Sequence, residues 1–178
     1  MDLITVLITS FLILSVFGSL MHFTHGWFKN GVLLHMFSAV NESTWEHMKL
    51  LVAPTLLVMV FQNIVLRGEY SNLINAILVL YIVEIVSIPL LYESLRLILK
   101  KIPFMITILI FYISIVLGLF SEYLALKNEI SIFSELISLI FIMIITFKFG
   151  ILTYFPPKIF LFKDPVTGRY GDKKHKNN

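Results

Sequence analysis

The chain has 178 residues, of which 58% are hydrophobic and only 14% are charged, and its mean hydropathy is +0.90. About a quarter of the residues of a soluble domain are charged, so this composition excludes a water-covered globular fold and predicts an integral membrane protein. The absence of cysteine excludes disulfides, thiolate zinc sites and a cysteine nucleophile.

Five apolar segments are long enough to cross a hydrocarbon core of about 30 Å, which needs roughly 20 residues. In chain order they cover residues 3–23, 45–66, 73–95, 102–124 and 132–154. Pro54 and Pro89 are expected to kink the second and third helices, and Pro156 and Pro157 to end the fifth. We therefore expect an all-α, polytopic bundle of five transmembrane helices over residues 1–154, with an interfacial tail over residues 155–178.

The basic residues are divided unequally between the two sides of this bundle. Only Arg67 and Lys127 fall on one side, and the other twelve of the fourteen fall on the opposite side. The positive-inside rule then puts the N-terminus outside and the C-terminus in the cytoplasm of a plasma membrane. This asymmetry explains the pI near 9.1 without a nucleic-acid partner. A basic end, Lys173–Lys176, would favour anionic membrane lipids.

The polar residues of the chain are concentrated at the start of the second span, in the stretch Asn41–Lys49. Ser43 followed by Glu46 forms a capping-box pattern, in which Ser43 accepts from the Glu46 amide and Glu46 reaches back to the Ser43 amide. Asn41 would close the preceding turn, and Trp45 is typical of a membrane-interface anchor. Helix capping alone leaves His47 unexplained.

Three histidines are predicted to meet at the cytoplasmic interface. His22 and His25 end the first helix on one face, and His47 begins the second at the same depth. Three such ligands would suffice for a catalytic zinc with an open position, and Glu46 or Glu42 could then act as the general base. Ser43, four residues before His47, shares its helix face. Zinc is therefore one cofactor hypothesis for this site.

Five further residues are candidates for ligand binding: Asn41, Trp45, His35, Glu84 and Lys148. His35 lies in the first loop, near the same interface. Glu84 falls close to the bilayer centre, where an acid marks a proton or substrate path or is held neutral by a neighbouring helix. Lys148 could pair with a ligand or snorkel to the interface. Five other acids are expected at the outer side: Asp2, Glu69, Glu122, Glu129 and Glu135.

The Ser43 and His47 pair is similar to the Ser-x-x-x-His arrangement of the alkaline ceramidase and adiponectin-receptor class of membrane hydrolases. That class also has seven spans and a late His-x-x-x-His pair, and this sequence has neither. The similarity is an analogy of local spacing only.

A broader resemblance covers nearly the whole chain. It rests on His22-Phe23, on the run from Val40 to Leu50 with Pro54 after it, and on Tyr154–Pro157 together with Asp164–Gly171. These motifs resemble the domain of unknown function 6512 family of small bacterial integral membrane proteins. The resemblance implies no activity, but it groups the first loop, the second helix start and the tail into one signature.

Three functional hypotheses follow for this chain. The first is a cytoplasmic-leaflet pocket that binds a lipid-like or small polar ligand. In its enzymatic form, this pocket would hydrolyse the ligand with the help of a metal ion. The second is a small proton-coupled transporter that uses Glu84, and the third is a non-catalytic scaffold for a partner protein. Membrane lipids are expected partners in each case, and no oligomeric state is predicted.

Overall fold

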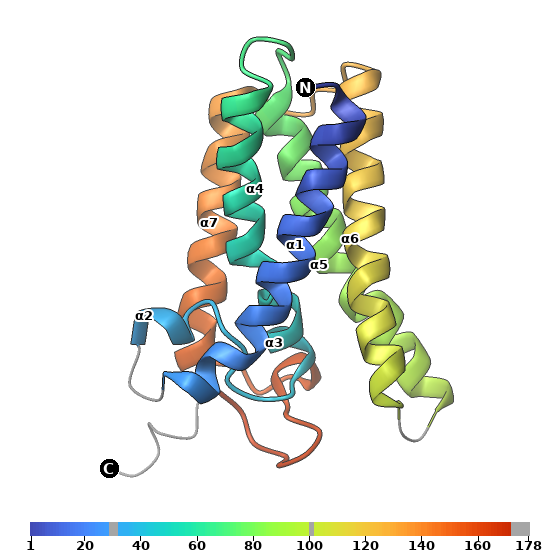
Figure 1. Cartoon of the computed structure of the whole chain (residues 1–178). Helices are drawn as coiled ribbons and strands as arrows, with labels where there is room; N and C mark the ends of the chain where they lie inside the picture. Colours follow the sequence, from blue (N-terminus) through green and yellow to red (C-terminus); the bar gives the residue numbers. More distant parts are fainter. Residues whose placement is uncertain (29–31, 100–101, 172–178) are drawn as a thin grey trace.

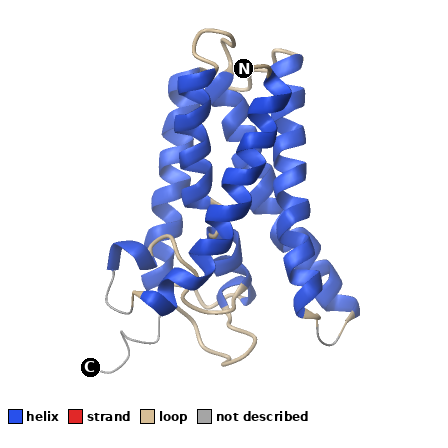
Figure 2. Ribbon diagram, in the orientation of Figure 1, coloured by secondary structure: helices blue, strands red, loops and turns tan. Residues whose placement is uncertain are grey.

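The computed structural model describes residues 1–28, 32–99 and 102–171, with the backbone alone at residues 25, 32 and 33. Five long helices lie side by side along one axis (Figure 1): α1 (Leu3–Trp27), α4 (Val52–Val65), α5 (Leu73–Ile98), α6 (Phe104–Lys127) and α7 (Glu135–Tyr154). Three short helical elements gather at the end opposite the N-terminus: α2 (Val32–His35), α3 (Thr44–Lys49) and η1 (Phe160–Phe162). We call this the α3 end of the bundle. The described residues form no strand (Figure 2), only an isolated antiparallel bridge between Lys163 and Tyr170.

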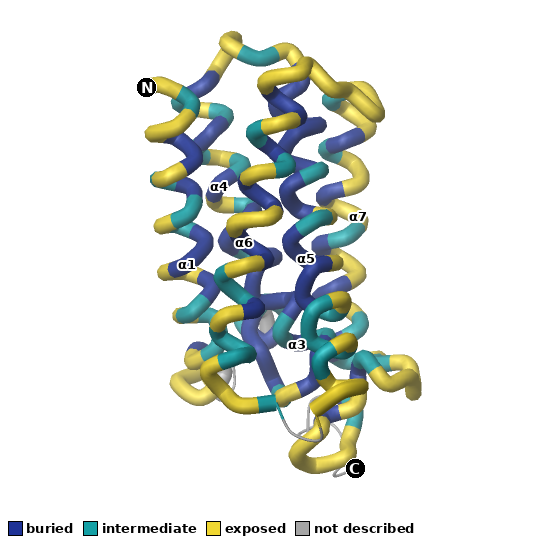
Figure 3. The backbone as a smooth tube through the Cα atoms, turned by 90° about the vertical axis from the view of Figure 1, so that its right-hand side faces the viewer, coloured by how far each residue is buried: buried dark blue, intermediate teal, exposed yellow. Residues whose placement is uncertain are grey.

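The prediction of a five-span helical membrane bundle is confirmed for the described part of the chain. Five helical segments there are long and apolar enough to cross a membrane, with α3 and α4 acting together as one span, Thr44–Val65. Large apolar side chains cover the outside of the helices, and buried positions face inward (Figure 3). Leu97, for example, is 90% exposed. Such a continuous apolar surface suits lipid and not water.

Helix α5 lies at the centre of the bundle. Its most apolar window is 56% buried, against 28% for the corresponding windows of α1 and α6. Gly118 allows α6 to approach it closely, because a Cβ at this position would lie 3.2 Å from the Leu80 carbonyl oxygen and 3.2 Å from the Glu84 Cβ. Glu84 therefore sits at a tight helix crossing.

Pro54 and Pro89 affect their helices differently. Pro54 has no amide hydrogen to donate to the Leu50 carbonyl, and the second span breaks directly before it, between Lys49 and Val52. The Leu50 and Leu51 amides instead bond three residues back, to His47 and Met48. Helix α5 continues through Pro89 to Ile98. In Figure 1 the lower ends of α5 and α6 lean away from α1 and α3.

The tail folds back against the α3 end. Trp45 stacks between Phe149 of α7 and Phe162 of η1, with ring centroids 4.2 and 4.4 Å apart. The chain turns after Asp164, whose backbone carbonyl accepts from the Gly168 amide at 2.8 Å. The basic end, Lys173–Lys176, lies outside the described residues.

Candidate functional site

Local hydrogen bonds fix the start of α3. The Ser43 hydroxyl accepts from the Glu46 amide at 3.4 Å, which is the N-cap that the sequence predicts. The Asn41 side chain accepts from the Ser43 amide at 2.8 Å and donates to the Gly171 carbonyl at 3.2 Å. Asn41 thus joins the helix start to the tail.

The second half of the predicted capping box is wrong. The Glu46 carboxylate does not return to the Ser43 amide, which Asn41 already occupies. It accepts instead from the Val40 amide at 3.1 Å and from Lys49 Nζ at 2.5 Å. The buried ammonium of Lys49 is a stronger partner for a carboxylate than a neutral amide, so the carboxylate turns toward it.

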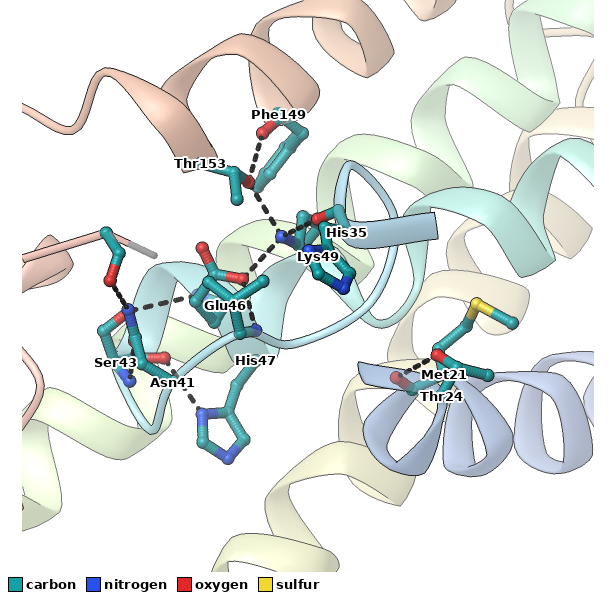
Figure 4. Close-up of polar contacts among 12 residues, drawn as sticks. Met21, Thr24, His35, Asn41, Ser43, Glu46, His47, Lys49, Phe149 and Thr153 are labelled. Carbon is teal, nitrogen blue, oxygen red and sulfur yellow. Dashed lines mark hydrogen bonds and ion pairs between the residues drawn. The ribbon is translucent and has the colours of Figure 1, made fainter. Parts of the chain in front are cut away.

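Lys49 is the polar centre of the α3 end. It is 0% exposed, and its ammonium group also donates to the His35 carbonyl at 2.9 Å and to Thr153 Oγ1 at 2.7 Å (Figure 4). These three bonds match the three hydrogens of an ammonium group. They connect the first loop, α3 and α7, so Glu46 and Lys49 build the frame of the site.

His47 leaves α3 on a different side from Glu46 (Figure 4). Its Nδ1 lies 3.0 Å from the Ser43 carbonyl, which favours hydrogen on Nδ1 and leaves Nε2 available as an acceptor or ligand atom. Nε2 lies 3.6 Å from a Glu42 carboxylate oxygen, and the His22 ring centroid is 5.9 Å from that of His47. The structure therefore brings together two of the three predicted histidines and one predicted carboxylate.

A cavity of ≈ 200 Å³ opens beside these two rings. It lies between α1, α3, α5 and α6, where the ends of α5 and α6 lean outward. Its polar lining comes from seven side chains: Ser19, His22, Thr44, His47, Tyr92, Thr107 and Tyr112. The rest of its wall is apolar, with Ile88, Phe104, Ile108 and Phe111 among its residues. The site is thus a mainly apolar pocket with a polar edge, as is typical of small-molecule sites.

The other predicted site residues do not line this cavity. The Ser43 hydroxyl caps α3, and the Glu46 carboxylate accepts from the Val40 amide. Trp45 stacks against the tail, and the Asn41 side chain donates to the Gly171 carbonyl. His35 Nε2 lies 3.1 Å from the Phe28 carbonyl, Lys148 is exposed on α7, and Glu84 lies deeper in the bundle. The His25 side chain lies outside the described part of the structure.

The described side chains contain no group of three or more histidine, cysteine, aspartate or glutamate residues that could hold a metal ion. His22 and His47 could supply two ligands, with Glu42 as the nearest carboxylate. A zinc site needs three or four protein ligands. The zinc set of His22, His25 and His47 therefore stays a prediction.

Sequence-based reasoning missed two residues that line the cavity, Thr44 and Tyr92. Thr44 Oγ1 donates to Glu93 Oε1 at 2.6 Å, and this bond joins α3 to the end of α5 beside the cavity. Tyr92 lines the cavity next to Glu93. A weak signal exists in the sequence, because Tyr92 and Glu93 lie at the same predicted depth as the Asn41–Lys49 stretch.

These features define the chain as a helical membrane protein with an amphipathic pocket at one end of its bundle. Residues 3–172 match the family described as a family of unknown function, DUF6512, and the chain belongs to that family. No curated protein and no solved structure matches the chain.

Proposed function

We propose that this protein binds a lipid-like ligand in the cavity beside His22 and His47. The observation that carries the proposal is the composition of the cavity wall, where two imidazoles and five hydroxyl groups meet a larger apolar surface. A ligand with a polar head and an alkyl part would match both regions. The polar residues would bind the head group, and the side chains of α6 would contact the alkyl part.

The location of the cavity supports this choice of ligand. It lies near the end of the lipid-exposed bundle, where helices α5 and α6 lean away from α1. The charge distribution, with most basic residues at the α3 end, supports a cytoplasmic C-terminus, and with that orientation the cavity would lie in the cytoplasmic leaflet of the plasma membrane. A lipid in that leaflet would reach the cavity without leaving the membrane.

A more specific hypothesis is that the same pocket hydrolyses its ligand. His47 Nε2 and the Glu42 carboxylate lie 3.6 Å apart, so a ligand atom for a metal has a carboxylate beside it, and Glu42 is half exposed. Glu42 is a better general-base candidate than Glu46, because Lys49 and the Val40 amide already occupy the Glu46 carboxylate. Metal analysis of the purified protein and of His47→Ala tests this hypothesis, which fails if the wild type holds no stoichiometric metal and shows no hydrolysis.

Photocrosslinking tests ligand binding directly. The protein is reconstituted with a phospholipid that carries a photoactivatable group on its acyl chain, and the modified peptides are mapped by mass spectrometry. We expect crosslinks on the cavity residues of α1 and α6. Ser19→Trp fills the cavity and should abolish them, whereas Val16→Trp, on the 53% exposed lipid-facing side of the same helix, should not.

Removal of single polar groups should weaken binding moderately. His22→Gln and His47→Ala each remove an imidazole contact, and a net hydrogen bond contributes about 0.5–1.5 kcal/mol, so we expect a loss of roughly 2- to 10-fold in affinity. Crosslinks distributed evenly over the lipid-facing surface, and insensitive to Ser19→Trp, would reject the proposal.

A further inference from the structure

Two carboxyl groups are fully buried inside the membrane-spanning bundle. Glu84 of α5 and Glu122 of α6 are both 0% exposed. Glu84 Oε2 and both carboxyl oxygens of Glu122 have no hydrogen-bond partner. An ionised carboxylate without partners is very unfavourable in such surroundings, so each group must be neutral or serve a function.

The sequence predicts Glu122 at the outer side of the membrane, and the structure adds that its side chain is buried between helices. Glu122 follows Ser114 and Gly118 at intervals of four residues, so all three lie on the face that packs against α5. Gly118 contacts Glu84 directly, and Glu122 lies one turn further along α6, close enough for the two carboxyls to interact electrostatically. The two acids therefore form a pair.

The hydroxyl group of Thr55 is the hydrogen-bond partner of Glu84. Thr55 Oγ1 lies 2.7 Å from the Leu51 carbonyl and in hydrogen-bond contact with Glu84 Oε1. A hydroxyl has one hydrogen, so Thr55 can donate to only one of these two oxygens at a time. When it donates to Leu51, the contact with Glu84 needs a protonated carboxyl that donates to Thr55, so the site accommodates Glu84 as a neutral acid.

Gln62 is the polar neighbour of Glu122. Gln62 Nε2 donates to Ser10 Oγ at 3.0 Å, and Gln62 Oε1 is buried and without a donor. The Gln62 amide lies beside the Glu122 carboxyl. Its second N–H can donate to an ionised Glu122 and its Oε1 can accept from a protonated one, so Gln62 suits either form of this carboxyl.

No basic group offsets the pair among the described residues. The described ion pairs engage other acids, Glu42, Glu46 and Glu93, and the side chains around Glu84 and Glu122 are neutral. They come from the surrounding helices: Ser10 and Ser15 of α1, Thr55 and Gln62 of α4, Tyr81 of α5, Ser114 of α6, and Thr146 of α7, which bonds Tyr81. The surroundings thus favour uncharged carboxyls.

We propose that Glu84 and Glu122 form an intramembrane proton-binding pair. Each carboxyl holds a proton in the described arrangement, and the charge left by release of one proton would make the other carboxyl hold its proton more tightly through their electrostatic interaction. Ile88 lies one turn from Glu84 on α5 and lines the cavity together with His22 and His47. Glu84 is therefore one helical turn from the cavity, through which protons would reach the pair. The pair does not depend on the identity of the cavity's ligand.

Infrared spectroscopy of the reconstituted protein tests the pair. At neutral pH the wild type should show the carbonyl band of protonated carboxyls. Glu84→Gln and Glu122→Gln should each reduce this band, and the double variant should remove it. Glu135→Gln is the matched control, because the Glu135 carboxylate accepts from the Ile74 and Asn75 amides at 2.8 and 3.0 Å and should contribute nothing. A wild type without the band, or a double variant that keeps it, would overturn the proposal.

A second measurement needs no variant and decides the matter if the glutamine variants do not fold. Dicyclohexylcarbodiimide is an apolar reagent that adds to protonated carboxyl groups, and mass spectrometry locates the adduct. We expect an adduct on Glu84 or Glu122 of the wild type and none on Glu135. Modification of Glu135 with neither member of the pair modified would contradict the proposal.

Discussion

Glu46 and Lys49 form an ion pair of 2.5 Å in which the carboxyl-bearing side chain is 2% exposed and the ammonium-bearing side chain 0% exposed. The pair belongs to a network that reaches Val40, His35 and Thr153. It therefore fixes the first loop and α7 to the short helix that presents His47. The position of α3 beside the cavity therefore depends on Glu46 and Lys49, although neither residue lines the cavity.

Loss of one member of this pair should be strongly destabilising. Lys49→Met leaves the Glu46 carboxylate buried with only the Val40 amide, and removal of one partner from a buried ion pair costs about 3–5 kcal/mol. Glu46→Gln combined with Lys49→Met should cost less than the sum of the two single changes. A double-mutant cycle on the free energy of unfolding in detergent measures this coupling, and Lys148→Met, at an exposed position, should stay within about 0.5 kcal/mol of the wild type.

The sequence predicts the spans well because hydropathy and length determine which segments cross a membrane. It also predicts the break near Pro54 and the N-cap at Ser43, since both follow from local backbone chemistry. The partner of Glu46 is not local in this sense, because it depends on whether Lys49 points to water or inward. The positive-inside rule treats Lys49 as an interfacial charge, and the structure buries it.

Glu122 shows the same limit of prediction from sequence. The sequence predicts that Glu122 lies at the outer side of the membrane, but not that its side chain is buried between helices. The face on which it lies depends on how α6 rotates against α5, and that rotation is set by Gly118 at the crossing. Depth can be predicted from residue number, but the direction of a side chain depends on packing between helices.

The first turn of α1 should depend on pH through Asp2. The Thr5 amide and the Thr5 hydroxyl donate to the Asp2 carboxylate, and these hydrogen bonds lower its pKa from 3.8. The stabilisation is therefore present above pH 3.8 and is lost as the pH falls through the lower folded-state pKa. Hydrogen exchange of the Thr5 amide should accelerate in that acidic range relative to its intrinsic rate. Asp2→Asn keeps a capping side chain that does not titrate, so its protection should not change with pH.

Trp45 should control the attachment of the tail. Its ring stacks on both Phe149 and Phe162, and each aromatic pair contributes about 0.5–1.5 kcal/mol beyond the area that it buries. Trp45→Ala should release η1 and speed tryptic cleavage at Lys158 and Lys163. Trp45→Phe should remain close to the wild type, because the indole nitrogen has no hydrogen-bond partner to lose. Trp27→Ala, at a 61% exposed position, is the control, and equal cleavage rates in all variants would mean that the stack does not hold the tail.

Two glycines should respond in opposite directions to the same substitution. At Gly118 a Cβ would lie 3.2 Å from both the Leu80 carbonyl and the Glu84 Cβ, so Gly118→Ala must push α6 away from α5. Overpacking of this kind costs about 1–3 kcal/mol, and it should outweigh the gain of up to about 1 kcal/mol in helix propensity. At Gly26 no atom lies within 4 Å of the added carbon, so Gly26→Ala should be neutral or stabilising. Thermal unfolding of both variants in the same detergent measures the difference. A stable Gly118→Ala variant would show that the helix crossing at Glu84 is looser than described, and the carboxyl pair would then have room for water.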